Sequence, residues 1–548
     1  MGRDGRTVRA VTRVAPGDRI ANRMNVPAEE SPWSRRRFLH CSSLLASAAV
    51  GAPTGLLARM ASPETQTPTR IADLEFDLND IYKWDDSNGD TWDPFWADDG
   101  RLYSFNCDGR GFGRIGKNLA FNRFDGTALR SLKGTQINRM AEYGPGGQRG
   151  QDNATWKACG QECIDGVFYA FVSRNVYGDE SHDPKMRQTA FNSSLIQSRD
   201  HGQTWRRDAE ENYRKPMWPG PSFGAPMFVH YGKNGGAVSE DRASEFVYAV
   251  STNGFWNGGD SLVLGRVARK ALSRLDAGDW EYFAGGDGNT AGAWKRSLDQ
   301  AAPILELPAK LGQTPVTYVP SLGIYLLISW YITAPMTKWF EPAGMRYDFY
   351  QAEHPWGPWS LIRSLSDSFL PQGSHMYGPA LCTKYEERHG SDVRLVMFTS
   401  GCQFEDKPTG IYKCWTIPVI LHTKPTPPSD LVPAASTALK FEGQWTSGPD
   451  DTRMSTKVGD SATLLFTGTA VECVAHKEDD FGSIDVYLDR ERPKRVALAL
   501  KNFPALSGVV VFRSPELAKG QHMLKIVNAG GGPVNIQSFR VYGAGSNP

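Results

Sequence analysis

Residues 198–205, Ser-Arg-Asp-His-Gly-Gln-Thr-Trp, are the stretch that decides the fold. They follow Ser-Ser-Leu-Ile-Gln (193–197), which is expected to form a strand. Gly202 supplies a tight turn, Asp200 accepts backbone hydrogen bonds inside it, and Trp205 packs back against the sheet. The pattern therefore predicts a β-hairpin with an aromatic anchor.

Similar strand–turn–strand segments recur between residues 70 and 421, and neither they nor their surroundings show sustained helical periodicity. Five of these segments begin at Trp92, Trp156, Phe223, Thr314 and Tyr377. We therefore predict an all-β chain whose larger domain, 70–421, is a five-bladed β-propeller, because closure protects the sheet edges. The stretch 412–420 could supply the strand that closes the ring. A pair of β-sandwiches would also account for the strands.

A Pro-rich segment separates this domain from a smaller one. We predict a linker at 422–433 and a β-sandwich at 434–543. Within the latter, Val-Tyr-Leu-Asp (486–489) and His-Met-Leu-Lys-Ile-Val (522–527) alternate apolar and polar residues, as sandwich strands do.

Several parts of the sequence resemble known families. The hairpin at 198–205 matches every fixed position of the Asp-box of sialidase-type propellers, which marks the fold and is not catalytic. The segment 93–103 resembles the first-blade pattern of the five-bladed arabinanases and β-xylosidases of glycoside hydrolase family 43. Segments 91–103 and 376–385 also resemble the domain-of-unknown-function family 4185, some of whose members cleave arabinofuranan. The smaller domain is similar to the jelly-roll, carbohydrate-binding modules of secreted glycosidases.

By the family 43 resemblance, Asp93 would be the general base that activates water, although it could instead cap a turn. An inverting mechanism also needs a carboxylic acid about 6.5–9.5 Å away, with a pKa raised by burial. The Glu-Gly-Pro motif that carries this acid in the family is absent here. We expect Glu162 or Asp260 to supply the second catalytic carboxyl group, with Asp348 as a weaker candidate.

Aromatic residues make up 11% of the chain, and flat aromatic faces can line a sugar site. We expect substrate contacts from Asp90, Trp92, Trp96, Arg174, Asn175, Trp256, Trp330, Asp348 and His375. No phosphate-binding, dinucleotide, zinc-protease or serine-hydrolase motif occurs. We therefore expect no cofactor and no catalytic metal, and leave a structural calcium ion open.

The first 61 residues hold ten Arg and no Lys. Ser-Arg-Arg-Arg-Phe-Leu (34–39), an apolar run and Ala-Arg-Met-Ala (58–61) resemble a twin-arginine export signal, which predicts a periplasmic or extracellular protein. The whole chain carries a formal charge of +1, so the part after this basic segment is acidic. This argues against nucleic acid as a partner, and no later membrane-spanning segment is expected.

The sequence thus predicts a secreted glycoside hydrolase that acts on a polysaccharide or oligosaccharide through paired carboxylates. Three alternatives stay open: a non-catalytic glycan-binding propeller, a sialidase-like enzyme and a polysaccharide lyase. The oligomeric state is left open.

Overall fold

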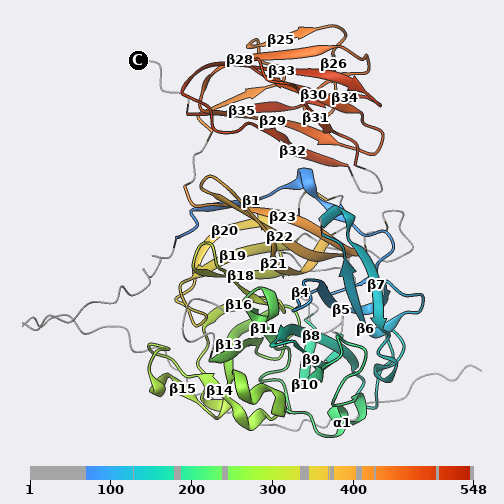
Figure 1. Cartoon of the computed structure of the whole chain (residues 1–548), viewed down its shortest axis with the longest axis vertical. Helices are drawn as coiled ribbons and strands as arrows, with labels where there is room; N and C mark the ends of the chain where they lie inside the picture. Colours follow the sequence, from blue (N-terminus) through green and yellow to red (C-terminus); the bar gives the residue numbers. More distant parts are fainter. Residues whose placement is uncertain are drawn as a thin grey trace, which may run out of the picture. The chain divides into compact units, whose positions relative to one another are not determined.

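The computed structural model describes residues 69–127, 129–177, 187–236, 245–333, 345–367, 369–370, 375–402, 410, 412–424, 428–500 and 505–543. The predicted export signal at 1–61 lies outside them. The chain divides into a unit that ends at Glu64 and one that begins at Thr65, and the described residues all belong to the second. Among them, the single α-helix is the short α1 (Ala209–Arg214), and strands form most of the regular structure (Figure 1). The all-β prediction is confirmed.

The first two sheets are antiparallel and follow each other along the chain. The first has the order β3-β5-β6-β7, with β4 also paired to β5, and the second has the order β10-β9-β8. Their strands are β3 (Asn88–Asp90), β4 (Phe95–Trp96), β5 (Leu102–Gly111), β6 (Lys117–Asp125), β7 (Lys133–Asn138), β8 (Thr155–Ile164), β9 (Val167–Val176) and β10 (Thr189–Ser198).

The next two groups of antiparallel strands are joined into one sheet by a short parallel pairing of β11 with β17. One group contains β11 (Met227–His230), β12 (Phe246–Thr252), β13 (Gly259–Ala268), β14 (Trp280–Phe283), β15 (Trp294–Lys295) and β16 (Leu305–Leu311). The other contains β17 (Val316–Val319), β18 (Ile324–Ile332), β19 (Met345–Ala352) and β20 (Ser360–Ser366).

A further sheet brings together the beginning and the end of the region 70–421. Its order is β1-β23-β22-β21, and β2 also pairs with β23. Asp73 of β1 lies opposite His422 of β23, in an antiparallel register that continues to Phe76 and Val419. The strands are β1 (Asp73–Phe76), β2 (Tyr82–Lys83), β21 (His375–His389), β22 (Asp392–Cys402) and β23 (Cys414–His422). This pairing covers the edge that β23 would otherwise expose.

The inner strands of these groups meet around a common centre. β4 contacts β8, β8 contacts β11, β11 contacts β17, β17 contacts β21, and β21 contacts β4 again, so the contacts close a ring. Bonds between the groups include Gly160 N–H donating to Pro226 O at 2.8 Å and Thr317 Oγ1 donating to Leu381 O at 3.3 Å. Side chains from different groups therefore converge at the centre of the ring.

The hairpin at 198–205 has the hydrogen bonds that its sequence calls for. Asp200 Oδ1 accepts from Thr204 N–H at 2.9 Å, and Gly202 N–H donates to Ser198 Oγ at 2.8 Å. Gly202 has a φ of +86° and lies against the Phe121 ring, so a side chain here would be strained and would clash. Trp205 packs against the same Phe121 ring at 5.2 Å. The anchor joins the second sheet to the first.

The C-terminal strands form further antiparallel sheets, with the orders β24-β35-β29-β32, β25-β28-β33-β30-β31 and β26-β27-β34. Burial alternates along β30, as expected for a strand with one face in a core. β24 falls inside the range predicted as a linker and pairs with β35. The strands are β24 (Asp430–Pro433), β25 (Leu439–Glu442), β26 (Thr446–Ser447), β27 (Arg453–Ser455), β28 (Ser461–Gly468), β29 (Ala470–Lys477), β30 (Ser483–Leu488), β31 (Lys494–Ala497), β32 (Leu506–Arg513), β33 (Gly520–Gly530), β34 (Val534–Ile536) and β35 (Ser538–Tyr542).

Candidate active site

Two carboxyl groups of the first sheet lie next to each other because its strands approach unusually closely. Asp90 on β3 is opposite Cys107 on β5, so Asp108 follows directly. Gly89 has a φ of +115°, and a Cβ on Gly109 would lie 2.4 Å from Asn88 O. Only glycine tolerates this approach. Asp108 itself has a φ of +45° in the irregular part of β5, which is uncommon for a residue with a side chain.

Asp90 is buried and bound by two tyrosine hydroxyl groups. Tyr377 on β21 donates to Asp90 Oδ2 at 2.6 Å, and the Tyr412 hydroxyl lies 3.0 Å from the same oxygen. Tyr412 is also 3.2 Å from the backbone oxygen of Asp108. The sheet that closes the ring thus holds a carboxyl group of the first sheet.

Asp108 is bound by side chains of the second sheet. Lys157 on β8 forms an ion pair with Asp108 Oδ2, and Tyr177, just after β9, donates to the same oxygen at 2.7 Å. Lys157 Nζ also donates to the Tyr177 hydroxyl at 3.1 Å. The Asp108 side chain is 19% exposed, whereas that of Lys157 is 3% exposed. We call Asp90, Asp108, Lys157, Tyr177, Tyr377 and Tyr412 the Asp90 cluster.

The surroundings shift the pKa values of this cluster in different directions. Burial raises the pKa of Asp90 to about 6, and the nearby Asp108 also raises it, against the lowering effect of Lys157 and the tyrosines. Burial alone would lower the pKa of Lys157, but Asp108, Tyr177 and Asp90 hold it well above its usual value. Burial raises the pKa of Tyr177 to about 12. Asp90 can therefore hold a proton near neutral pH beside an ammonium ion that compensates Asp108.

A second group joins three other ionisable side chains. His230, at the end of β11, contacts Asp93 Oδ1 through Nε2 at 2.9 Å and Glu162 Oε2 through Nδ1 at 2.7 Å. The side chains of His230, Asp93 and Glu162 are 7%, 4% and 1% exposed. Burial alone would lower the pKa of His230, but the two carboxylates raise it to about 10. Burial also raises the pKa of Glu162. Each ring nitrogen of His230 therefore lies within hydrogen-bond distance of one carboxyl group. We call these residues the His230 triad.

Two other predicted carboxylates make their bonds elsewhere. Asp260 is 40% exposed, accepts from Ala309 N–H at 2.8 Å and lies 3.5 Å from Arg187. Asp348 accepts from Ser364 at 2.5 Å and from Tyr331 at 3.2 Å. Their predicted roles stay predictions.

The remaining polar residues predicted to bind substrate are buried. Arg174 forms a two-pronged ion pair with Asp152, at 2.8 and 2.7 Å, and lies over the Trp156 ring at 4.5 Å. Asn175 lies beside it on β9, and His375 begins β21. Burial lowers the pKa of His375 to about 4, so this imidazole is neutral at physiological pH.

The predicted sugar-stacking indoles are mostly packed inside the protein. Trp92 is completely buried, packs on Phe112 at 5.4 Å, and donates from Nε1 to Gly89 O at 2.9 Å. Trp256 and Trp330 are also buried, and Trp96 is half-buried. These indoles contribute to the core, and their contact with sugar stays a prediction.

Sequence reasoning missed Asp108, Lys157, Tyr177 and His230, and it used Tyr377 and Tyr412 only as strand markers. Lys157 and Glu162 are five positions apart, so a regular strand would direct them to opposite faces. The register of β8 shifts between Ala158 and Gln161. Lys157 contacts Asp108 of the preceding sheet, and Glu162 contacts His230 of the following group of strands. No sequence signal locates that irregularity, but Asp108-Gly109 was a visible turn-like pair inside an apolar strand.

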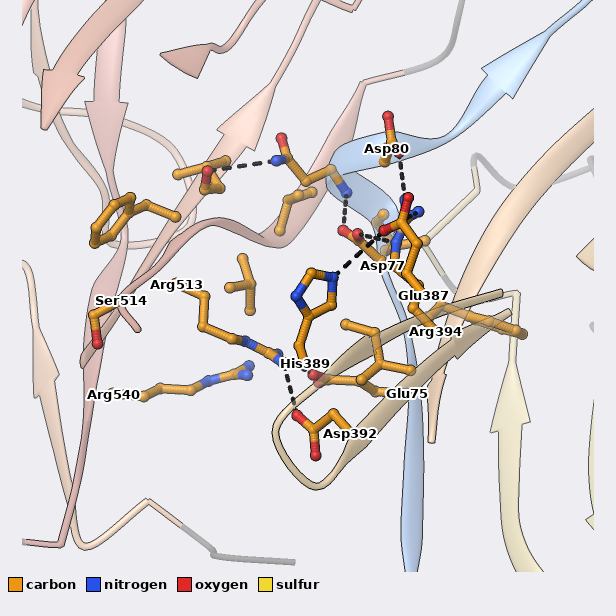
Figure 2. A pocket seen from close by; sticks show the side chains of 18 of the residues that line it. Glu75, Asp77, Asp80, Glu387, His389, Asp392, Arg394, Arg513, Ser514 and Arg540 are labelled. Carbon is orange, nitrogen blue, oxygen red and sulfur yellow. Dashed lines mark hydrogen bonds and ion pairs between the residues drawn. The ribbon is translucent and has the colours of Figure 1, made fainter. Parts of the chain in front are cut away.

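A cavity of about 680 Å³ lies outside these two groups. Figure 2 shows Arg513 and Arg540 pointing into it, with Glu75 and Asp392 opposite. Arg513 pairs with Glu75 and, at 2.8 Å, with Glu472, which Arg540 also contacts at 3.3 Å. The arginines that line this cavity are therefore already compensated by carboxylates.

His422, beside this cavity, should make stability depend on pH. It lies 3.0 Å from Asp392 and 3.6 Å from Glu75, and these partners raise its pKa to about 9 although burial alone would lower it. A folded-state pKa above the unfolded value means that the stabilisation is complete below about pH 6.5 and is lost as the pH rises through about 9. We expect the free energy of unfolding to fall over this window and His422→Gln to flatten the fall. Urea titrations from pH 6 to 10 measure it, and an equal slope in both proteins contradicts the prediction.

No helix in the described part of the chain is both long and apolar enough to cross a membrane. The described residues also contain no group of three or more His, Cys, Asp or Glu side chains arranged to hold a metal ion.

Comparison with known sequences gives two partial matches. Residues 164–401 match the model of a family described as Domain of unknown function (DUF4185), which confirms the predicted resemblance over this range. The range contains Tyr177, His230 and Tyr377 but not Asp90 or Asp108. A curated relative, "A type blood alpha-D-galactosamine galactosaminidase" of Flavonifractor plautii, is 29% identical over 112 residues. The match covers 19% of this chain and 10% of the relative, so the chain spans about a tenth of that protein's length.

Among solved structures, the chain is similar to a xylan β-1,4-xylosidase from Bacillus halodurans (10% identity, TM-score 0.34, covering 84% of this chain and 99% of that chain). It is also similar to an exo-β-1,3-galactanase from Phanerochaete chrysosporium (10% identity, TM-score 0.34, covering 83% of this chain and 96% of that chain). A third similar structure is a family 43 arabinoxylan arabinofuranohydrolase from Bacillus subtilis (13% identity, TM-score 0.31, covering 84% of this chain and 96% of that chain).

Proposed function

We propose that the chain is a glycoside hydrolase that cleaves a polysaccharide, with Asp90 and Asp108 as its paired carboxyl groups. One observation carries the proposal: a buried carboxyl group with a pKa of about 6 lies beside a partly exposed carboxylate that is paired with a buried lysine. Glycosidases need two carboxyl groups in opposite protonation states, and neighbouring groups in unlike surroundings provide them.

In this mechanism Asp90 is the general acid. It donates its proton to the glycosidic oxygen as the bond from that oxygen to the anomeric carbon breaks, so that the leaving sugar departs as a neutral alcohol. Tyr377 and Tyr412 fix the orientation of the carboxyl group. A pKa of about 6 keeps a useful share of Asp90 protonated near neutral pH and leaves it acidic enough to release the proton.

Asp108 acts on the anomeric carbon. Positive charge develops on the sugar ring in the transition state, and the carboxylate stabilises that charge. The water that adds to the anomeric carbon gives one proton to the Asp90 carboxylate, which restores the acid. Lys157 and Tyr177 hold Asp108 Oδ2 from one side. They direct the carboxylate and offset the unfavourable interaction between two adjacent acids.

Backbone strain supports this location. Asp108 itself has a φ of +45°, and Thr91, which follows Asp90, has a φ of +54°. Such conformations are especially costly for a β-branched residue, and they persist where surrounding contacts impose them, commonly at functional sites. Asp93 instead contacts His230, whose other ring nitrogen contacts Glu162. The predicted role of Asp93 as general base stays a prediction, and the proposal assigns the reacting groups to Asp90 and Asp108.

The proposal includes the arrangement around the site. The ring of inner-strand contacts supports a five-bladed propeller. The antiparallel C-terminal sheets support a sandwich there, for which we propose carbohydrate binding. Export by the twin-arginine route completes the proposal and rests on the residues quoted from 34 to 61. A sialidase-like tyrosine nucleophile is not supported at Tyr177, because burial raises its pKa to about 12 and so opposes ionisation.

The test is release of reducing ends from arabinan, arabinogalactan, arabinoxylan and β-1,3-galactan by the full chain. We expect release from at least one polysaccharide and a loss of about 1,000-fold in Asp108→Asn, because the amide cannot supply the charge that stabilises the transition state. Binding without release in all four would instead favour a non-catalytic glycan-binding protein. A product that absorbs in the ultraviolet through a new double bond would indicate a lyase.

A further inference from the structure

We propose that His230 is a positioning residue that fixes one end of the segment 89–93 and thereby the carboxyl group of Asp90. The inference rests on the proposed function, because it concerns the placement of the acid in that mechanism. His230 acts through Asp93, and no part of the His230 triad needs to touch the substrate.

The triad connects strands that share few backbone hydrogen bonds. Asp93 lies between β3 and β4 of the first sheet, Glu162 on β8 of the second, and His230 on β11 of the third group. The two hydrogen bonds of the His230 ring therefore cross between three groups of strands around the centre of the ring. Glu162 is itself fixed, because its Oε1 accepts from Cys163 N–H at 2.9 Å.

Stability alone is a weak reason for such a group. Moving ionised side chains out of water is unfavourable, and apolar residues of similar volume often serve equally well or better. A second feature indicates that the triad serves to fix geometry. One of its members, Asp93, lies on the segment that carries Asp90. Asp90 and Asp93 are three positions apart, which limits their separation to about 10 Å even in an extended chain.

The segment between them is strained and held at several points. Thr91 has a φ of +54°, and its N–H donates to Ser400 Oγ at 2.9 Å. Tyr377 holds Asp90 at one end, and His230 holds Asp93 at the other. A strained conformation relaxes when one of its restraints is removed. Loss of the bond to His230 is therefore expected to move Asp90, and a displacement of about 1 Å can lower a rate about 100-fold.

Asp93→Asn and Asp93→Ala test this role in the full chain. Asparagine keeps an oxygen that accepts the N–H of His230, whereas alanine does not. We expect Asp93→Asn to keep kcat within about fivefold of the wild type, and Asp93→Ala to lower kcat about 10- to 100-fold with KM within about twofold. Glu162→Gln and Glu162→Ala should follow the same order, and Asp86→Asn, which changes an exposed carboxylate nearby, is the control.

Two results would overturn the inference. If Asp93→Asn is as inactive as Asp93→Ala, Asp93 itself is a reacting group. If both variants keep full activity, the bond to His230 does not position Asp90. Near-UV circular dichroism reports whether each variant folds. If Asp93→Ala does not fold, Asp93→Ser replaces it, because a serine side chain is too short to reach His230. Full activity in Asp90→Asn would refute the proposed function itself, whichever order the Asp93 variants show.

Discussion

Asp90→Asn is expected to lower kcat on the polysaccharide about 1,000-fold, with KM changed less than about threefold, because the amide is isosteric but has no acidic proton to donate. Tyr377 and Tyr412 can still donate to the amide oxygen, so the fold should be kept. A 4-nitrophenyl glycoside of the same sugar distinguishes the role, since its leaving group departs without protonation. On this substrate the loss of kcat in Asp90→Asn should be much smaller than on the polysaccharide.

The carboxyl group of Asp90 should also set the alkaline side of the pH–rate profile. Burial raises the pKa of Asp90 to about 6, and a general acid works only in its protonated form. We therefore expect kcat/KM of the wild type to fall as the pH rises through about 6, and Asp90→Asn to lack this fall. Initial rates between pH 4 and 9 measure it. An equal loss on both substrates, or an unchanged profile in the variant, would show that Asp90 is not the acid.

Lys157→Met is expected to lower the free energy of unfolding by about 3–5 kcal/mol, because it leaves Asp108 without its counter-ion in a mostly buried site. Methionine keeps the volume of the side chain, so the loss reports the charge. Urea unfolding measures it. Lys440→Met is the matched control, since Lys440 is exposed and pairs with Glu442 at the surface, and little change is expected there.

A double variant separates charge from packing. Lys157→Met with Asp108→Asn removes both charges and should recover a large part of the lost stability, since an unpaired buried charge is less favourable than a neutral pair. If the double variant is as unstable as the sum of the single ones, the loss comes from packing and the ion pair does not stabilise the site.

Local sequence patterns identified some of the residues of this site. Asp90 and Asp93 stood out because they lie in the densest cluster of carboxylates and aromatic residues, and Asp93-Pro94 also matches the family 43 pattern. Glu162 was a candidate because it lies on the first strand of the second predicted blade. The structure joins Asp93 and Glu162 through His230, but His230 ends a short apolar strand and has no neighbours in sequence that mark it.

Other members of the site depend on features that residue patterns do not encode. Tyr377 and Tyr412 reach Asp90 only because the last sheet of the ring returns to the first. Lys157 reaches Asp108 because β8 lies beside β5 in the ring. The indole of Trp92 could have faced solvent by its sequence, yet its burial follows from Phe112 and Phe124 packing around it.

The sequence by itself determined the strands, the hairpin at 198–205 and the all-β class, because alternation, turn residues and β-branched side chains act over a few neighbouring positions. Only the tertiary structure decided which acids form pairs. Asp90 meets Asp108 across two strands whose glycines allow close approach, and Asp93 meets His230 from another group of strands. A pKa is set by burial and by charges within a few ångströms, and those distances exist only after strands far apart in the chain have closed the ring.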